Sequence, residues 1–235
     1  MRQFCFLWLC FLISGKMALG QSPLVYEYAN FDRFKADNQR VMAQPNPGNR
    51  VVFMGNSITE AWSSRQADFW EPPNYINRGI SGQVTHQMLL RFRRDVLDLN
   101  PAVVVILAGT NDLAQNSGPV PLEMIMENIE SMTEMARFRG CKVILCSVLP
   151  AIKFPWKPEV APVEIIPRLN QMIKAYAQKN GLSYVDYYSA LVDDQGGLKV
   201  PDYTTAQDLV HPNQTAYEIM ASLVNSAIQS TLRKK

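Results

Sequence analysis

Residues 102–108 read Ala-Val-Val-Val-Ile-Leu-Ala, an apolar run without a polar residue, and Gly109-Thr110-Asn111-Asp112 follows at once. A strand with one wet face alternates apolar and polar side chains, whereas a continuous run is typical of a strand covered on both faces. Such strands belong to parallel sheets, because the crossover helices of those sheets lie on both faces. This stretch therefore predicts a central parallel strand that ends in a polar turn.

Four further segments have the composition of buried strands. They lie at 51–55, 75–80, 142–148 and 183–188. The segment at 75–80 is the weakest of them. The central strand itself is expected to cover 102–109.

Apolar residues between these strands recur at helical spacing. The predicted helices lie at 32–42, 83–99, 122–139, about 165–176 and about 219–228. Gly181 is a stop signal for the fourth helix, and Pro212 is expected in the first turn of the last one. The proline-rich stretch 150–167 is expected to be a long ordered loop. Strands that alternate with crossovers predict one α/β domain with a parallel sheet.

The first twenty residues have the pattern of a cleaved export signal. Arg2 supplies the positive start, residues 4–13 form a short apolar core, and Ala18-Leu19-Gly20 is a small-x-small cleavage site. This core is shorter than the roughly 20 apolar residues that span a bilayer. We therefore expect a signal peptide at 1–20, a single domain at 21–235, a periplasmic or secreted location, and no stable membrane anchor.

The charge balance argues against a nucleic-acid partner. The sequence has 23 Lys and Arg residues against 21 Asp and Glu, and removal of Arg2 and Lys16 with the signal leaves 21 of each. A chain with no basic excess and no strong basic cluster has little attraction for phosphate backbones. No His, Cys or Asp cluster has zinc spacing, and Gly196-Gly197 does not precede a helix as a phosphate loop would. We expect neither a metal nor a cofactor.

Two cysteines, Cys141 and Cys146, remain after the signal. On one extended strand their Cα atoms would lie about 16 Å apart. A disulfide requires a separation of less than about 7 Å. Both thiols are therefore expected to be reduced and buried.

Polar motifs follow several of the predicted strands. Ser57 comes after the first, Ser81-Gly82 after the second and Asn111 after the third, while Asp208 and His211 come after the last. Ligands of open α/β sheets bind outside the carboxyl ends of the strands, so these motifs should meet at one rim. A serine, a histidine and an aspartate are the groups that make a hydroxyl nucleophilic at neutral pH.

These motifs resemble the conserved blocks of the SGNH hydrolases, also called the GDSL esterase/lipase family. The matching blocks are Gly55-Asn56-Ser57-Ile58-Thr59, Gly79-Ile80-Ser81-Gly82, Gly109-Thr110-Asn111-Asp112 and Asp208-x-x-His211. Each block is weak alone, but four in the right order are specific. The resemblance implies a three-layer α/β/α sandwich with a flavodoxin-like parallel sheet, and serine esterase chemistry without a metal.

The resemblance also implies a role for each residue. Ser57 would attack an ester carbonyl, His211 would carry the proton, and Asp208 would hold the imidazole. The N–H groups of Ser57 and Gly82 and the amide of Asn111 would form the oxyanion hole.

Three neighbouring residues have more ordinary expectations. Asp112 is expected to be a structural cap, and His86 a surface residue. Where the family usually has aspartate before the nucleophile, this chain has Asn56. Both side chains can accept a hydrogen bond within a tight turn, so we interpret this change as structural.

The expected substrate is a small-molecule or polysaccharide ester, with O-acetyl groups on carbohydrates favoured. Trp62 and Trp156 are candidate stacking platforms for a sugar, although packing in the core or a loop is the more common role for each. Hydrolysis of lysophospholipids or thioesters is the main alternative. A non-catalytic sugar-binding module and an acetyltransferase also remain open, because fold does not fix function.

Overall fold

The computed structural model describes residues 23–46, 48–70 and 74–233, so the predicted export signal lies outside the described residues. Five parallel strands form a sheet in the order β2-β1-β3-β4-β5. The strands are β1 (Val51–Gly55), β2 (Tyr75–Gly79), β3 (Val103–Leu107), β4 (Lys142–Cys146) and β5 (Ser183–Val185). This order is the flavodoxin-like one, which confirms the predicted fold class.

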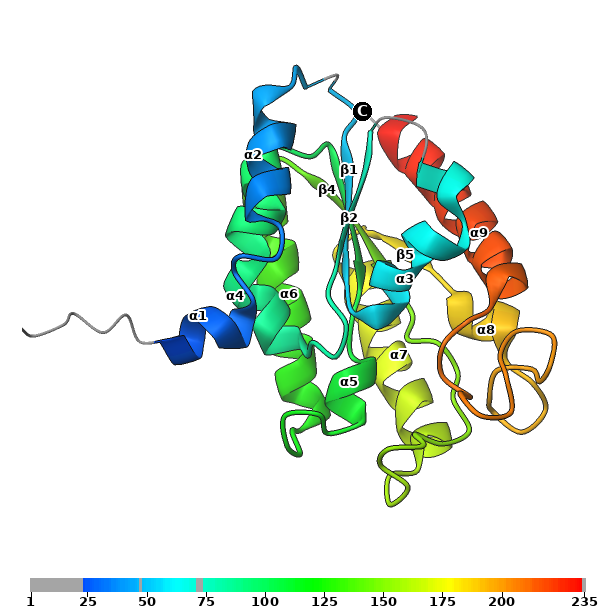
Figure 1. Ribbon diagram of the computed structural model, residues 1–235. Helices are drawn as coiled ribbons and strands as arrows, with labels where there is room; N and C mark the ends of the chain where they lie inside the picture. The colour runs from blue at the N-terminus through cyan, green and yellow to red at the C-terminus, as the bar shows by residue number, and fades with distance from the viewer. Residues whose placement is uncertain (1–22, 47, 71–73, 234–235) are drawn as a thin grey trace, which may run out of the picture.

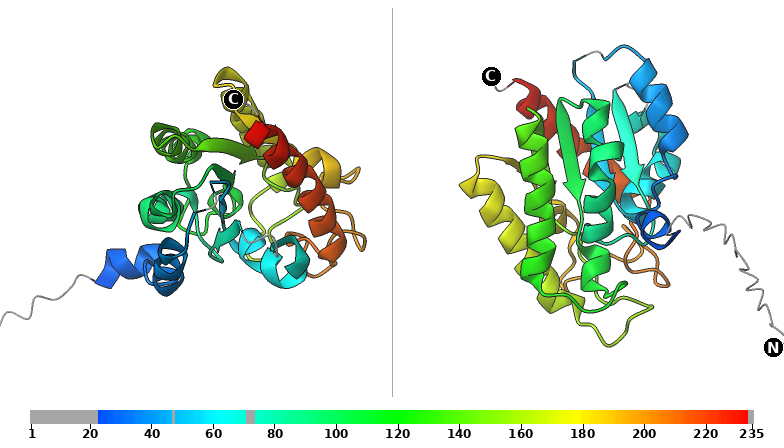
Figure 2. Two further views of the ribbon diagram at one scale, coloured as in Figure 1. Left: turned by 90° about the horizontal axis from the view of Figure 1, so that it is seen from above. Right: turned by 90° about the vertical axis from the view of Figure 1, so that its left-hand side faces the viewer.

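Helices cover both faces of the sheet (Figure 1; Figure 2). One face carries α4 (Thr85–Asp95), α6 (Leu122–Phe138) and α7 (Pro162–Lys179). The other face carries α3 (Ser57–Arg65), the 3₁₀ helix η1 (Ala67–Trp70), α8 (Tyr187–Leu191) and α9 (Gln214–Arg233). The remaining elements are α1 (Pro23–Ala29), α2 (Lys35–Ala43), the 3₁₀ helix η2 (Leu97–Leu99) and α5 (Thr110–Leu113).

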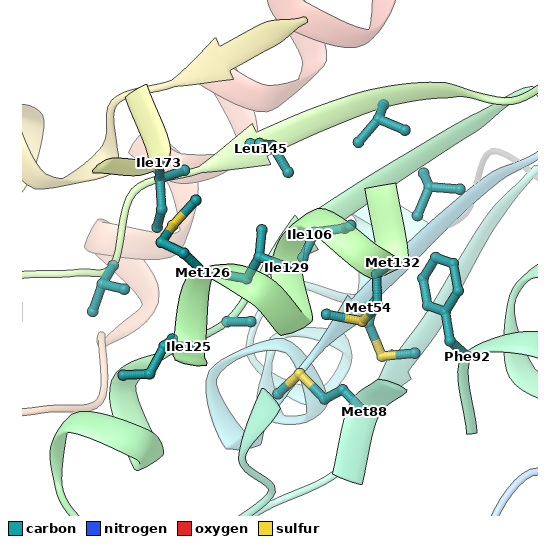
Figure 3. Close-up of a cluster of buried hydrophobic side chains, with 14 of the residues drawn as sticks. Met54, Met88, Phe92, Ile106, Ile125, Met126, Ile129, Met132, Leu145 and Ile173 are labelled. Atoms are coloured by element: carbon teal, nitrogen blue, oxygen red, sulfur yellow. The ribbon is translucent and has the colours of Figure 1, made fainter. Parts of the chain in front are cut away.

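The apolar run of β3 divides its side chains between two cores. Val104 and Ile106 belong to the cluster under α4, α6 and α7, part of which Figure 3 shows. Val103, Val105 and Leu107 belong to the cluster under α3 and α9. Because all five residues are buried, neither face tolerates a polar side chain, and this accounts for the continuous run.

Three sequence predictions about boundaries are wrong. The fourth long helix, α7, begins at Pro162 rather than at about residue 165, so the ordered loop predicted at 150–167 is shorter than expected. The strand at 183–188 stops at Val185, because the Asp186 side chain accepts the Ser189 N–H (3.0 Å) and caps α8. Pro212 precedes α9, whose first turn is instead capped by the Asn213 side chain.

Other expectations agree with the fold. Cys141 and Cys146 are free and buried, as predicted. None of the helices in the described ranges is long and apolar enough to cross a membrane.

One guanidinium lies buried beneath the carboxyl ends of β1 and β2. Arg91 of α4 donates to the carbonyls of Gly55 (3.2 Å) and Arg78 (2.9 Å), the last residue of β1 and the fourth of β2. Its other N–H groups bond the Gln83 side chain (2.5 Å) and the Asp95 carboxylate (3.1 Å). Burial lowers the pKa of Arg91 to about 10 against the opposing effect of Asp95, so the group stays charged at neutral pH.

Arg91→Met should therefore destabilise the fold strongly, because it leaves Asp95 as a buried carboxylate without its cation. Loss of one partner of a buried pair typically costs about 3–5 kcal/mol of unfolding free energy. Urea denaturation would measure this loss. Arg91→Met/Asp95→Leu should lose less than the single variant, and the exposed Arg93→Met should lose almost nothing. An Arg91→Met protein as stable as Arg93→Met would contradict the structural role of Arg91.

Candidate active site

Ser57 is the first residue of α3 and follows directly on the turn after β1. The preceding residue, Asn56, is the N-cap, and its side-chain oxygen accepts the Ile58 N–H (3.1 Å). Asn56 thus makes the local hydrogen bond that was expected of either residue at this position. The serine consequently sits at the positive end of the helix dipole, where a developing negative charge is favoured.

Two glycines allow α3 to approach the strands closely. A Cβ at Gly55 would lie 2.0 Å from the Thr59 Oγ1 atom, and a Cβ at Gly79 would lie 2.2 Å from the Glu60 backbone nitrogen. Any side chain at these positions would push the first turn of α3 away from β1 and β2. The glycines of the first and second blocks thus fix the position of Ser57.

Ser57, His211 and Asp208 form one chain of hydrogen bonds. The Ser57 Oγ atom lies 2.9 Å from His211 Nε2. The other ring nitrogen, His211 Nδ1, lies 2.8 and 3.1 Å from the two carboxylate oxygens of Asp208. This arrangement brings the predicted serine together with the predicted aspartate and histidine.

The loop that carries Asp208 and His211 is tightly held. The Asp208 carboxylate also accepts the backbone N–H groups of Val210 (3.2 Å) and His211 (2.9 Å). Thr204 Oγ1 donates to the His211 carbonyl (2.9 Å). Leu209 adopts a φ of +66°, which is unfavourable for a leucine and is tolerated only where the surroundings impose it. This turn folds the carboxylate back onto the histidine.

The environment favours the ionised form of Asp208. Partial burial alone raises the pKa of this carboxyl, but hydrogen bonds from the His211 backbone and imidazole outweigh it and hold the pKa below its ordinary value. The carboxylate therefore remains negative beside the imidazole throughout the neutral range.

Each predicted oxyanion donor, on Ser57, Gly82 and Asn111, keeps an N–H without an acceptor in the described part of the chain. The Asn111 amide donates one N–H to the Gln83 carbonyl (3.0 Å), which leaves its second N–H available. Within the described ranges, no acceptor bonds the backbone N–H of Ser57 or Gly82. Gly82 has a φ of +78°, a conformation that glycine adopts without strain.

Asp112 fixes the loop between Gly82 and α4. Its carboxylate accepts the Thr85 N–H at 3.0 Å and the Thr85 hydroxyl at 2.6 Å, at the start of α4. Burial raises the pKa of Asp112 although the bonds from Thr85 oppose it. Asp112 is thus the structural cap that the sequence predicted. His86, expected at the surface, is partly exposed and stacks on the ring of Tyr28.

The cleft around Ser57 is open and mostly polar, with a volume of about 470 Å³. Its lining comprises Arg33, Ser57, Glu60, Ala61, Ser64, Arg65, Ser81, Asp208, His211, Pro212 and Tyr217. The described residues contain no group of three or more His, Cys, Asp or Glu side chains that could hold a metal ion.

Three charged residues of this cleft, Arg33, Glu60 and Arg65, were missed by sequence reasoning. Glu60 accepts the Ser81 N–H (2.9 Å) and pairs with Arg33 (2.9 Å), so the loop after β2 is tied to α3. Glu60 stands three residues after Ser57, a helical spacing that places both on one face and could have drawn attention to it. Arg33 precedes α2 and carries no comparable signal.

The two tryptophans predicted to contact a sugar, Trp62 and Trp156, differ sharply in their exposure. Trp62 is only 1% exposed and stacks on Phe69 with ring centroids 4.9 Å apart, so the prediction that it contacts substrate is wrong. Trp156 is 46% exposed, and its indole N–H donates to the Asn116 side chain (2.9 Å). The Asn116 N–H in turn bonds the Asn111 carbonyl (3.0 Å), which links Trp156 to the loop carrying the oxyanion candidate.

Comparisons with a family model and with solved structures agree with each other. Residues 53–219 match the GDSL-like lipase/acylhydrolase family. The chain is similar to the crystal structure of a GDSL-like lipase from Bacteroides thetaiotaomicron, with 46% identity and a TM-score of 0.82 over 86% of this chain and 98% of that one.

A curated relative carries a more specific name. An acetylxylan esterase of Xylanibacter ruminicola is 29% identical over 219 residues, which is 77% of this chain and 43% of the esterase. The chain spans less than half the length of each of the three curated relatives that it matches.

Asp208→Asn should reveal the stabilising effect of the carboxylate. A carboxyl whose pKa is lower in the folded state stabilises the fold above its unfolded value, about 4, and this contribution is lost as the pH falls through the folded value. The variant should therefore have a lower urea midpoint than the wild type at pH 7, and the difference should narrow below about pH 4.

The control for this prediction is Asp202→Asn, which changes an exposed aspartate of the same loop. If the wild type kept the same difference in urea midpoint over Asp208→Asn at pH 3 as at pH 7, this would contradict the lowered pKa of Asp208.

Proposed function

This chain belongs to the GDSL-like lipase/acylhydrolase family, and on that basis we propose that it is a carboxylic-ester hydrolase whose nucleophile is Ser57. The observation that carries the proposal is the hydrogen-bonded chain from Ser57 through His211 to Asp208 at the carboxyl end of the sheet. A serine placed in this way has a base within proton-transfer distance and an acid that orients the base.

The reaction follows in two half-reactions. The Ser57 oxygen attacks the carbonyl carbon while His211 Nε2 accepts its proton. The bond to the alcohol oxygen then breaks, His211 returns the proton to the departing alcohol, and the acyl group remains on Ser57. Water attacks this acyl-enzyme while His211 accepts a proton from it. The bond between the acyl carbon and the Ser57 oxygen then breaks, His211 returns the proton to that oxygen, and the carboxylic acid leaves.

Donors around Ser57 stabilise the charge that develops on the carbonyl oxygen. We assign the oxyanion hole to the backbone N–H groups of Ser57 and Gly82 and to the free N–H of the Asn111 amide. Because Gln83 fixes the first N–H of that amide, the second is held in place before the substrate arrives. Preorganised donors of this kind are usually the largest single contribution to such catalysis.

The cleft favours a short acyl group on a polar alcohol. Its walls are mainly hydroxyl, carboxylate and guanidinium groups, which would have to be desolvated against a long alkyl chain. We therefore propose acetyl esters of carbohydrates as substrates, with Trp156 as a stacking face. The similarity to an acetylxylan esterase supports this choice, although that enzyme is more than twice as long as the matched region.

The predicted export signal is consistent with a polysaccharide substrate outside the cytoplasm. We therefore propose that the protein acts in the periplasm or after secretion. Proteins for the experiments below would accordingly begin at Gln21.

Ser57→Ala should lower kcat on p-nitrophenyl acetate by at least about 10⁴-fold, as is usual when a member of such a triad is removed. Asn111→Ala should lower kcat by about 10²–10³-fold, because one oxyanion donor is lost. Steady-state kinetics with thermal unfolding of each variant would test both. The control is Ser131→Ala on α6. Activity of Ser57→Ala equal to that control would refute Ser57 as the nucleophile.

A substrate panel should separate the candidate functions. Acetate release from acetylated xylan and p-nitrophenyl acetate should exceed octanoate release from p-nitrophenyl octanoate. Trp156→Ala should raise KM for acetylated xylan alone, whereas Phe138→Ala, which removes another exposed aromatic ring, should not. A preference for octanoate would favour a lipase or thioesterase. Acetyl transfer to added xylotriose that outruns hydrolysis would favour a transferase, and binding without turnover a sugar-binding module.

A further inference from the structure

A second cavity lies along the open edge of the sheet, outside the catalytic cleft. Its volume is about 520 Å³, within the range of small-molecule sites. The cavity is lined by residues of α2, the edge strand β2 and η1. In Figure 1, β2 lies between α2 on the left and α3 on the right.

The lining of this edge cavity is strongly basic. Four arginines line it, namely Arg33, Arg40, Arg50 and Arg78, against one carboxylate. Four positive groups minus one negative group, Asp37, give a formal charge of +3. Glu60, which pairs with Arg33 from outside the lining, reduces the local charge to +2. An excess of this kind in a concave site attracts anions.

Two of these arginine side chains are buried and hydrogen-bonded within the protein. Arg78 is only 2% exposed and donates to Asp37 (2.7 Å) and to the Asn38 side chain (3.0 Å). Arg50 is 6% exposed and donates only to the backbone carbonyls of Leu99 and Val41. Burial lowers the pKa of Arg50, and no carboxylate among the described residues pairs with it. The positive charge of Arg50 is therefore hydrogen-bonded only to neutral carbonyl groups.

Trp70 and Tyr75 give the edge cavity an aromatic wall. The indole N–H of Trp70 is buried and has no hydrogen-bond acceptor in the described part of the chain. Such unpaired buried donors are rare, because each costs desolvation free energy. Tyr75 lines the cavity beside it. An aromatic ring together with N–H donors suits a sugar that carries acceptor oxygens.

The edge cavity adjoins the catalytic cleft at Arg33, which lines both. Ser63 lines the edge cavity and its neighbour on α3, Ser64, lines the catalytic cleft. One extended substrate could therefore occupy both sites at once, with its ester at Ser57.

We propose that the edge cavity is a subsite for a uronate unit, a sugar that carries a carboxylate, in the polysaccharide whose ester is cleaved at Ser57. The role of this subsite in catalysis rests on the proposed esterase function, whereas the binding of the sugar acid does not. Guanidinium groups match a planar carboxylate through paired N–H donors, and this geometry distinguishes it from a neutral sugar. The substrate class is thus an acidic acetylated polysaccharide.

Direct binding can be measured without turnover on the Ser57→Ala protein by isothermal titration calorimetry. Trigalacturonate should bind at least tenfold more tightly than the neutral xylotriose, and added NaCl should weaken it. Sodium sulfate, an anion without a sugar, should bind more weakly than trigalacturonate. Equal affinity for trigalacturonate and xylotriose, or for trigalacturonate and sulfate, would overturn the proposal.

Variants place the binding in the edge cavity. Arg40→Gln removes an exposed cation and should weaken trigalacturonate binding at least fivefold. Thermal unfolding would verify that the variant is folded. Arg93→Gln, an exposed arginine of α4 outside the cavity, is the matched control. Equal losses in Arg93→Gln, or no loss in Arg40→Gln, would locate the site elsewhere and refute the proposal.

Kinetics separate this proposal from the proposed function. With Ser57 intact, Arg40→Gln should raise KM for an acetylated uronate-containing polysaccharide and leave both acetylated xylan and p-nitrophenyl acetate unaffected. An unchanged KM for the acidic polysaccharide would overturn the proposed link between the edge cavity and the ester site. Trigalacturonate binding without any Ser57-dependent hydrolysis would reject the esterase and retain the uronate site.

Discussion

The buried guanidinium of Arg91 is the contact on which the geometry of the active site depends. It joins the carbonyl of Gly55, one residue before the N-cap of α3, to the carbonyl of Arg78 on β2 and to the side chain of Gln83. The backbone of Gln83 then accepts the Asn111 amide. The turn that carries Ser57 and the loop that carries Gly82 are therefore tied to a single cation, and Asn111 is joined to it through Gln83.

The other parts of the site are held in place by individual hydrogen bonds. Glu60 ties α3 to the Ser81 N–H, and Asp112 ties α5 to the start of α4. The loop with His211 is fixed from the other side, because Tyr217 of α9 donates to the Ile58 carbonyl (2.7 Å) within α3. Side chains from opposite ends of the chain can thus meet within hydrogen-bonding distance on a rigid rim.

The sequence predicted the elements whose signal is local. The apolar run of β3 predicts burial on both faces because every position is apolar, and the block order predicts that Ser57, Asp208 and His211 meet. Trp62 was misassigned as a possible substrate contact, because proximity to the nucleophile in sequence does not show which face of α3 is buried.

Other features depend on tertiary contacts. Position 209 holds a leucine rather than the glycine or asparagine that would signal a positive φ. Arg33 reaches the cleft through its ion pair with Glu60 of α3, a contact between segments far apart in the sequence. The start of α7 at Pro162 was missed since a proline-rich stretch favours a loop locally, whereas buried Ile166 and Leu169 extend the apolar stripe of the helix.

The position of β2 at the margin of the sheet has a consequence for the solubility of the protein. A margin strand presents unpaired N–H and C=O groups to which a strand of another molecule can add, and this is a common route to aggregation. The opposite margin is formed by β5, which has only three residues and offers little to pair with. Along β2, two molecules approaching edge to edge would bring their arginine clusters together, and the mutual repulsion would keep the chains apart.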